Sequence, residues 1–204
     1  MKTGTKGMTP GKLIFVLGGA RSGKSSFAQE LARNIGSQVA YIATAQAKDE
    51  EMRQRIIKHQ ASRPSSWQTI EETHRLEKAI REHGEKAEVI IVDCLTLWIS
   101  NLLLDGNTDE FILRQAGNLV RAAKLISAGT ILVANEVGLG LVPDNALGRI
   151  YRDVAGRVNQ LVAGQADKVY FVVAGLAFEL KSLPPPLPSP FEGEGRGGGK
   201  RGME

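Results

Sequence analysis

Short apolar runs alternate with longer amphipathic stretches along most of this chain. Runs rich in valine and isoleucine are strand candidates, at 13–17, 39–43, 88–93, 130–135 and 168–174, with a weaker one at 67–71. Apolar residues at helical spacing indicate helices between them, at 24–34, 49–60, 73–82, 95–104, 109–127 and 145–163. Strands that alternate with helices predict an α/β domain whose mostly parallel sheet carries helices on both faces. Runs as uninterrupted as "VIIV" and "YFVV" are typical of strands buried on both sides.

The two ends of the chain lack this alternation. Residues 1–11 are rich in Gly, Thr and Lys, and residues 182–204 hold five of the eight prolines. Such compositions cannot bury a core, so we expect both segments to be disordered. The folded part is therefore predicted to be one domain at 12–181.

The composition is that of an ordinary globular protein and argues against nucleic-acid binding and membrane-spanning segments. Of the 204 residues, 42% are hydrophobic and 24% are charged, as in ordinary soluble globular proteins. The net charge is +4, and no internal block of Lys and Arg forms the basic stripe expected of a nucleic-acid binder. No stretch reaches the roughly 20 apolar residues that span a bilayer. A single cysteine, Cys94, excludes an intramolecular disulfide and suits a reducing cytoplasm.

The first strand candidate runs directly into "LGGARSGKSS", where Gly18 is followed, after four residues, by Gly23-Lys24-Ser25. This spacing between a strand and an amphipathic helix is typical of a phosphate-binding P-loop. Backbone N–H groups between the glycines converge on phosphate oxygens, Lys24 supplies positive charge, and Ser25 offers a hydroxyl to Mg²⁺. The loop predicts a bound nucleoside triphosphate, but hydrolases, kinases and motors all use it.

Two acidic residues end strand candidates. Asp93 closes "VIIVD", where it can bind Mg²⁺ beside a P-loop or cap the following helix. Glu136 follows the strand at 130–135 and opens "EVGLGLVP". It can accept a proton from a substrate hydroxyl, or it can be a solvated loop carboxylate.

His59 lies in "DEEMRQRIIKHQASRP", where a helix places it on one face with Met52 and Ile56. The pattern alone favours a surface or interface histidine. A neutral histidine can nevertheless attack phosphorus as a nucleophile. The rival residues His74 and His83 have no glycine loop or acidic strand end beside them.

The segments "GGARSGKS", "YIATAQ", "DEEMRQRIIKHQASRP", "VDCLTLWISNLL", "NEVGLGLVP" and "RDVAGRVNQ" occur in this order. Together they resemble the bifunctional adenosylcobinamide kinase/adenosylcobinamide-phosphate guanylyltransferase family of cobalamin biosynthesis, over about residues 12–181. A P-loop alone is unspecific, whereas its combination with H-x-x-x-R-P and N-E-V-G-x-G-x-V-P is specific. The resemblance implies a RecA-like P-loop fold, assembled as a homotrimer with the helix at 49–60 near a subunit boundary.

The resemblance also implies two reactions. ATP or GTP phosphorylates the aminopropanol hydroxyl of (adenosyl)cobinamide, and GTP then donates GMP to cobinamide phosphate, giving GDP-cobinamide and pyrophosphate. In the family the GMP passes through a covalent bond to a histidine, and the matching residue here is His59. Some members carry another histidine just before it, where this chain has Lys58.

The site residues that follow fall into overlapping groups. The residues expected to take part in catalysis are His59, Lys24, Arg63 and Glu136. Those expected to hold Mg²⁺ are Ser25 and Asp93. The nucleotide contacts that the resemblance implies are Gly18, Gly19, Ala20, Arg21, Ser22, Gly23, Lys24, Ser25, Ala43, Thr44, Ala45, Gln60, Ala61, Ser62, Arg63, Glu71 and Asp93.

Three other functions stay open on the sequence alone. The chain can be a RecA-like ATPase that acts on nucleic acid, although it lacks the basic stripe that such binding needs. It can be a kinase for another small alcohol, or a domain that binds nucleotide and regulates a partner. The transferase is favoured, with GTP, ATP, cobinamide and cobinamide phosphate as small-molecule substrates and no nucleic-acid partner.

Overall fold

The computed structural model describes residues 11–47, 49–61 and 63–182. The segments predicted to be disordered lie outside the described residues, apart from Gly11 and Ser182 at their inner ends. In the described part a sheet of seven strands runs through the centre, with the order β3-β2-β4-β5-β1-β6-β7. All neighbouring strands pair in parallel except β6 and β7, which pair antiparallel. The strands are β1 (Leu13–Gly18), β2 (Val39–Ala43), β3 (Gln68–Glu71), β4 (Val89–Asp93), β5 (Gly129–Asn135), β6 (Lys168–Val173) and β7 (Leu176–Glu179).

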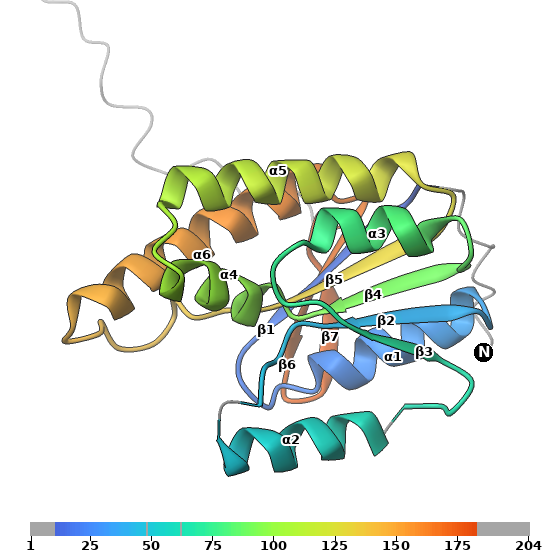
Figure 1. Ribbon diagram of the computed structural model, residues 1–204, viewed down its shortest axis with the longest axis horizontal. Coiled ribbons are helices and arrows are strands. Elements are labelled where there is room, and N and C mark those ends of the chain that lie inside the picture. Colours follow the sequence, from blue (N-terminus) through green and yellow to red (C-terminus); the bar gives the residue numbers. More distant parts are fainter. Residues whose placement is uncertain (1–10, 48, 62, 183–204) are drawn as a thin grey trace, which may run out of the picture.

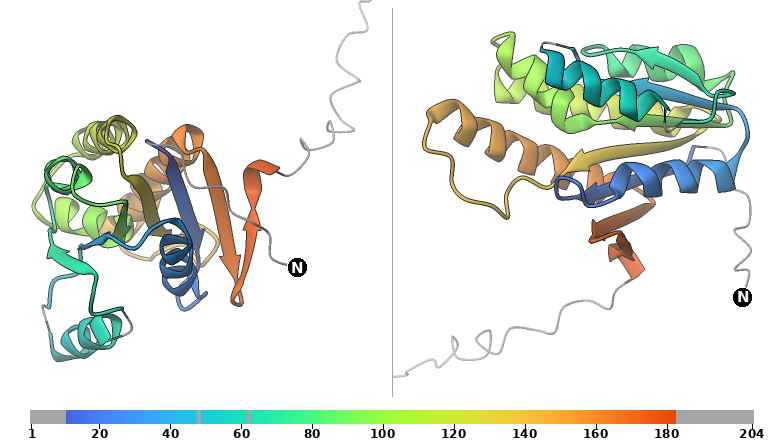
Figure 2. Two further views of the ribbon diagram at one scale, coloured as in Figure 1. Left: turned by 90° about the vertical axis from the view of Figure 1, so that its right-hand side faces the viewer. Right: turned by 90° about the horizontal axis from the view of Figure 1, so that it is seen from below.

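Helices cover both faces of this sheet, which confirms the predicted architecture (Figures 1 and 2). The helices α3, α4, α5 and α6 lie on one side of the sheet, and α1 lies on the other. The helix α2 stands beyond α1 at the edge near β3. The helices are α1 (Lys24–Ile35), α2 (Glu50–Ala61), α3 (Leu76–Gly84), α4 (Leu95–Leu104), α5 (Asp109–Leu125) and α6 (Ala146–Gln165), and a short 3₁₀ turn follows at Leu180–Ser182.

Two local features differ from the sequence prediction. The helix expected at 73–82 begins only at Leu76, because the Glu72 carboxylate accepts hydrogen bonds from the N–H groups of His74 and Arg75 and holds a turn there. The strand β7 was not predicted. It is four residues long, mostly exposed and paired only with β6, so it lacks the apolar run that marks the central strands.

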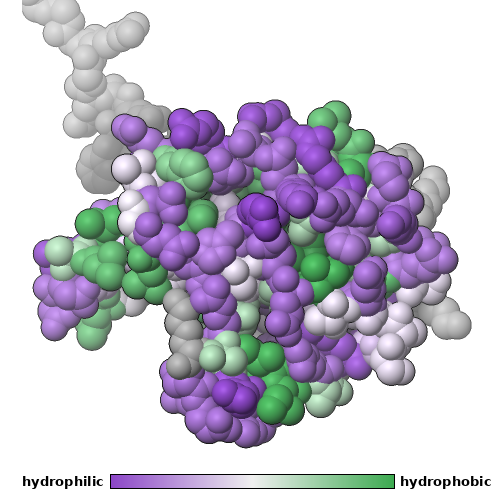
Figure 3. Space-filling view, viewed as in Figure 1, coloured by the Kyte–Doolittle hydropathy of each residue, from purple (hydrophilic) through white to green (hydrophobic). Residues whose placement is uncertain are grey.

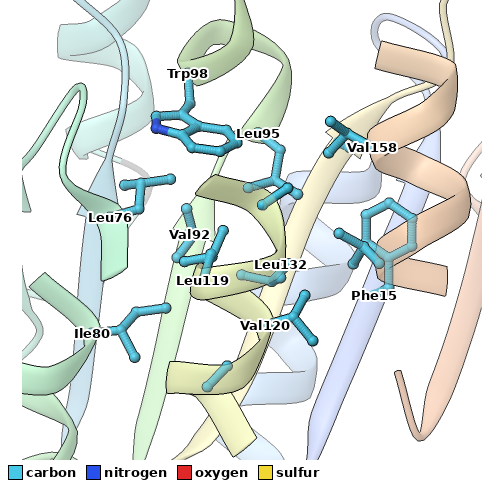
Figure 4. Close-up of a cluster of buried hydrophobic side chains, with 14 of the residues drawn as sticks. Phe15, Leu76, Ile80, Val92, Leu95, Trp98, Leu119, Val120, Leu132 and Val158 are labelled. Carbon is cyan, nitrogen blue, oxygen red and sulfur yellow. The ribbon is translucent and has the colours of Figure 1, made fainter. Parts of the chain in front are cut away.

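Side chains of the central strands alternate between two apolar clusters. In β1, Leu13 and Phe15 join the cluster under α3 to α6, whereas Ile14 and Val16 pack on the α1 side. Figure 4 shows part of the larger cluster, where Trp98 of α4 lies among side chains from the sheet and from neighbouring helices. Burial on both faces explains why these strands carry apolar residues at successive positions.

Phe15 offers a test of this packing, because its ring is fully buried in the larger cluster. We expect Phe15→Ala to lower the free energy of unfolding by about 3–5 kcal/mol, since it removes buried apolar surface and leaves a cavity. Urea denaturation followed by circular dichroism measures the change. The matched control is Phe178→Ala on β7, where the ring is 53% exposed and the expected loss is below about 1 kcal/mol. Equal losses for both variants would contradict the assigned core.

Candidate active site

Four neighbouring strands end with a residue that faces the α1 side of the sheet. Counting back by two along each strand reaches members of the cluster on that side, such as Ile91 before Asp93 and Val133 before Asn135. The same count applies to Gly18 of β1 and Ala43 of β2. The carboxyl ends of parallel strands share one edge, so these residues gather beside the loop that enters α1.

The P-loop joins β1 to α1 at this edge. Gly18 packs so closely on β6 that a Cβ there would lie 2.4 Å from the Val172 carbonyl oxygen, so any larger residue would force the backbone to shift. Gly23 has a φ of 94° and no side chain to cap α1, and the first turn of the helix is free of acidic residues. The helix N-terminus is therefore suited to phosphate. The Lys24 ammonium is nearly buried and donates to the Gly19 carbonyl oxygen at 3.3 Å.

Two cavities meet at the start of α1. The inner one, about 150 Å³, contains eight of the expected site residues, namely Lys24, Ser25, Ala43, Ala45, His59, Arg63, Glu71 and Asp93. The outer one, about 680 Å³, follows the P-loop and is lined by Arg21, Ser22, Gly23, Lys24, Ser25, Ser26, Glu51, Gln54, Lys58 and His59. Both cavities include Lys24, Ser25 and His59. The fold thus brings the histidine of α2 against the P-loop, although the two motifs are far apart in the sequence.

The comparisons with known proteins agree with this geometry. The family model for cobinamide kinase / cobinamide phosphate guanyltransferase (CobU) matches residues 14–180. This chain belongs to that family. The match confirms the resemblance that the motifs carry, and with it the expected class of kinase and nucleotidyltransferase.

Individual relatives cover nearly all of the folded part. The bifunctional adenosylcobalamin biosynthesis protein CobP of Pseudomonas aeruginosa is 46% identical over 176 residues, which are 83% of this chain and 97% of that protein. The protein CobU of Escherichia coli K12 is 40% identical over 181 residues, 83% of this chain and 99% of that one. Among solved structures, the flagellar accessory protein FlaH of Methanocaldococcus jannaschii aligns with a TM-score of 0.51 at 21% identity, covering 85% of this chain and 80% of that one. This likeness concerns the fold alone and confirms the RecA-like α/β architecture.

In this CobU-family chain, Asp93 lines the inner cavity and does not cap the helix α4. One carboxylate oxygen accepts a hydrogen bond from the Tyr41 hydroxyl at 2.6 Å, and the first residue before α4 is Cys94 instead. Burial, followed by the negative charge of Asp93, raises the pKa of the Tyr41 phenol well above its usual value. Tyr41 therefore stays protonated and orients the carboxylate. No sequence pattern indicates this role, because Tyr41 occupies one position of an apolar strand.

Arg63 lies against the same tyrosine. Its guanidinium carbon is 3.6 Å from the centre of the Tyr41 ring, and Nη1 donates to the Thr69 hydroxyl at 3.4 Å. The Nε–H group is buried and has no hydrogen-bond partner in the described part of the chain. A planar cation held flat on a ring, with a donor to spare, is suited to bind a phosphate oxygen.

The residues present fit the expected Mg²⁺. The Ser25 hydroxyl and the Asp93 carboxylate come from different elements and line the same cavity. Oxygen donors of this kind suit Mg²⁺, which commonly takes one or two protein ligands and completes its shell with phosphate oxygens and water. The metal remains a proposal, and no further protein ligand is needed for it.

Several expected contacts fall elsewhere. The side-chain oxygen of Thr44 is fully buried and both donates to and accepts from the backbone of Cys94, at 2.8 Å each, so it joins the ends of β2 and β4. The Glu136 carboxylate accepts from the Gly138 N–H at 2.5 Å and lies outside the lining of both cavities. Gln60 and Ala61 are exposed at the end of α2, and Ser62 lies outside the described residues. The roles assigned to these residues stay predictions.

Cys94 is a core residue rather than a nucleophile. The thiol belongs to the α1-side cluster and is almost completely buried. Burial, together with the charge of Asp93, raises the pKa of the Cys94 thiol to about 11. A thiol that stays protonated at neutral pH is a poor nucleophile, so Cys94 serves packing.

Lys24 provides a test of the phosphate site. We expect Lys24→Ala to weaken binding of Mg·GTP by about 10- to 100-fold, because a nearly buried charged donor to phosphate is lost. Isothermal titration calorimetry measures the affinity. The control is Lys78→Ala, which removes an exposed ammonium from α3. Unchanged affinity in Lys24→Ala would remove the P-loop from the nucleotide site.

Proposed function

We propose that this chain phosphorylates the aminopropanol hydroxyl of (adenosyl)cobinamide with ATP or GTP, and then transfers GMP from GTP to cobinamide phosphate. Family membership supports the two reaction types. The observation that carries the proposal is that the P-loop residues Lys24 and Ser25 and the histidine His59 line both cavities. The P-loop thus lies beside a histidine that can act as a nucleophile. Nucleotide hydrolases and motor proteins do not need such a residue.

In the kinase step the protein mainly positions charge. The amides at the start of α1 and Lys24 hold the outer phosphates, and the Arg63 guanidinium offsets the charge that spreads over the transferred group. Mg²⁺ held by Ser25 and Asp93 would supply further neutralisation of the phosphate oxygens. The alcohol oxygen bonds to the γ-phosphorus while the β–γ bridging bond breaks, and the electron pair stays on the nucleoside diphosphate.

In the guanylyl step we assign the attack to His59. A neutral imidazole nitrogen bonds to the α-phosphorus of GTP as pyrophosphate leaves, so that two displacements replace one. An oxygen of cobinamide phosphate then takes the GMP group and releases the histidine. The phosphates held by the P-loop are the leaving pyrophosphate here, whereas in the kinase step the outermost one is transferred. We also infer that the substrates are small molecules in the cytoplasm and that no nucleic acid takes part.

His59→Ala tests the nucleophile. We expect the variant to phosphorylate cobinamide at near wild-type rate but to lose covalent labelling by α-³²P-GTP, because only the guanylyl step needs the imidazole. Labelling is measured on denatured protein, where a phosphoramidate bond is acid-labile. His83→Ala, on α3 and away from both cavities, is the control and should label normally. Full labelling of His59→Ala would contradict the assignment, and wild-type enzyme that makes no GDP-cobinamide would contradict the proposed function.

We also propose that the chain assembles as a homotrimer. Apolar side chains gather on a projecting lobe formed by the start of α6 and the loop before it, seen at the left of Figure 3. The exposed members are Leu139, Leu141, Val142, Leu147 and Ile150. An apolar surface of this kind favours contact with another copy.

Light scattering after size-exclusion chromatography checks this assembly. We expect three times the 22.0 kDa mass of the chain, and a smaller species for the double variant Leu141→Glu/Ile150→Glu, because charges would be buried at the contact. The exposed Leu125 on α5 gives the control variant Leu125→Glu, which should not change the mass. A monomeric wild-type chain would refute the trimer.

A further inference from the structure

Asn135 ends β5 inside the inner cavity, beside Lys24, Ser25 and Asp93. By the alternation of β5 it faces the α1 side, two residues beyond the buried Val133. In the sheet it lies opposite Gly18, the last residue of the neighbouring strand β1, where the P-loop begins. The sequence prediction concerns its neighbour Glu136, whose carboxylate lies outside the lining of both cavities.

The backbone of Asn135 is fixed from two helices. Its N–H donates to the hydroxyl of Thr96 on α4 at 2.6 Å, and its carbonyl oxygen accepts from the Asn159 amide on α6 at 3.4 Å. Both partners are buried polar side chains, which are costly to bury unless they are hydrogen-bonded. These contacts set the position of Asn135 before any ligand binds.

Among the residues that the structure describes, the side-chain oxygen of Asn135, unlike its backbone, is not hydrogen-bonded. Its Oδ1 atom is buried yet has no hydrogen-bond partner within the described residues. A buried carbonyl oxygen without a partner costs free energy, which a ligand that donates a hydrogen bond recovers. Phosphate oxygens are acceptors and cannot fill this place. Within the proposed function, the ligand donors expected beside the γ-phosphate are the hydroxyl of the acceptor alcohol and water on the metal ion.

We propose that Asn135 binds the hydroxyl of the acceptor alcohol in the kinase step. Oδ1 accepts the O–H hydrogen bond, and this turns an oxygen lone pair toward the γ-phosphorus. The new O–P bond forms as the β–γ bridging P–O bond breaks, and the hydroxyl proton passes to an oxygen of the transferred phosphoryl group and then to water. A loose transition state needs little help from a base, so an amide that orients the alcohol is sufficient.

This inference rests on the proposed function, and it assigns the Asn135 oxygen to only one of the two reactions. The acceptor in the kinase step is an alcohol, which donates a hydrogen bond. In the guanylyl step the nucleophile that attacks GTP is the imidazole of His59, and the final acceptor is a phosphate, and neither needs the Asn135 oxygen. Loss of that oxygen should therefore affect the kinase step selectively, whereas a role in holding metal-bound water would affect both.

The variant Asn135→Leu keeps the branched shape but removes the acceptor. We expect kcat/KM for phosphorylation of cobinamide to fall about 10- to 100-fold, with covalent labelling by α-³²P-GTP and the affinity for Mg·GTP kept within about twofold. The control is Thr130→Val. It removes a different buried side-chain oxygen, a hydroxyl without a partner in the described region, near the opposite end of β5, and should leave both steps unchanged. Thermal unfolding confirms that each variant is folded, and Asn135→Ala replaces Asn135→Leu if the latter is not.

Two results would overturn the inference. Kinase activity within twofold of wild type would show that the oxygen does not contact the alcohol. Equal losses of kinase activity, labelling and Mg·GTP affinity would assign the side chain to the nucleotide or to metal-bound water instead. Wild-type enzyme that lacks cobinamide kinase activity would refute the proposed function itself, which is a separate outcome from either of these.

Discussion

The sheet is buried on both faces, and the site depends on this constraint. Side chains alternate along each central strand, so a strand that fills both apolar clusters has a single register in the fold. A slip of one residue in β4 would turn Asp93 toward α4 and bring Val92 to the P-loop side. Apolar packing over the whole sheet, more than contact among polar groups, therefore decides which residues face the phosphates.

The order of the strands sets the spacing of the site. Because β5 lies between β1 and β4, the acid Asp93 is two strands away from Gly18 and the P-loop. Two strand spacings are about 10 Å, enough for a phosphate group and a hydrated cation between the two walls. The residue at the floor of that gap is Asn135, so its unpartnered side-chain oxygen lies where a small donor can reach it.

The sequence predicted most of what lies within one contiguous motif. The P-loop, its strand and its helix follow from local spacing, and so does the alternation that defines the fold. The roles of Tyr41 and Asn135 did not follow, because each depends on which strands are neighbours. Tyr41 meets Asp93 only because β2 pairs with β4, and no local pattern in an apolar strand records that pairing. Thr44, whose nucleotide contact the family resemblance implies, likewise makes its side-chain contact with Cys94 between strands, which no local pattern records.

A single cradle can serve two reactions if the reacting atoms approach from different sides. Lys24 and Ser25 line both cavities, so phosphates bound there as proposed would border each of them. The inner cavity is lined by residues at the ends of strands, such as Asp93 and Asn135. Groups held by a sheet are suited to orient an alcohol. His59 lines both cavities, but it comes from α2, a helix that lies outside the sheet (Figure 1). On the proposed assignment, the nucleophile and the residue that orients the acceptor alcohol therefore belong to different elements, α2 and β5, so each can serve its own reaction within one domain.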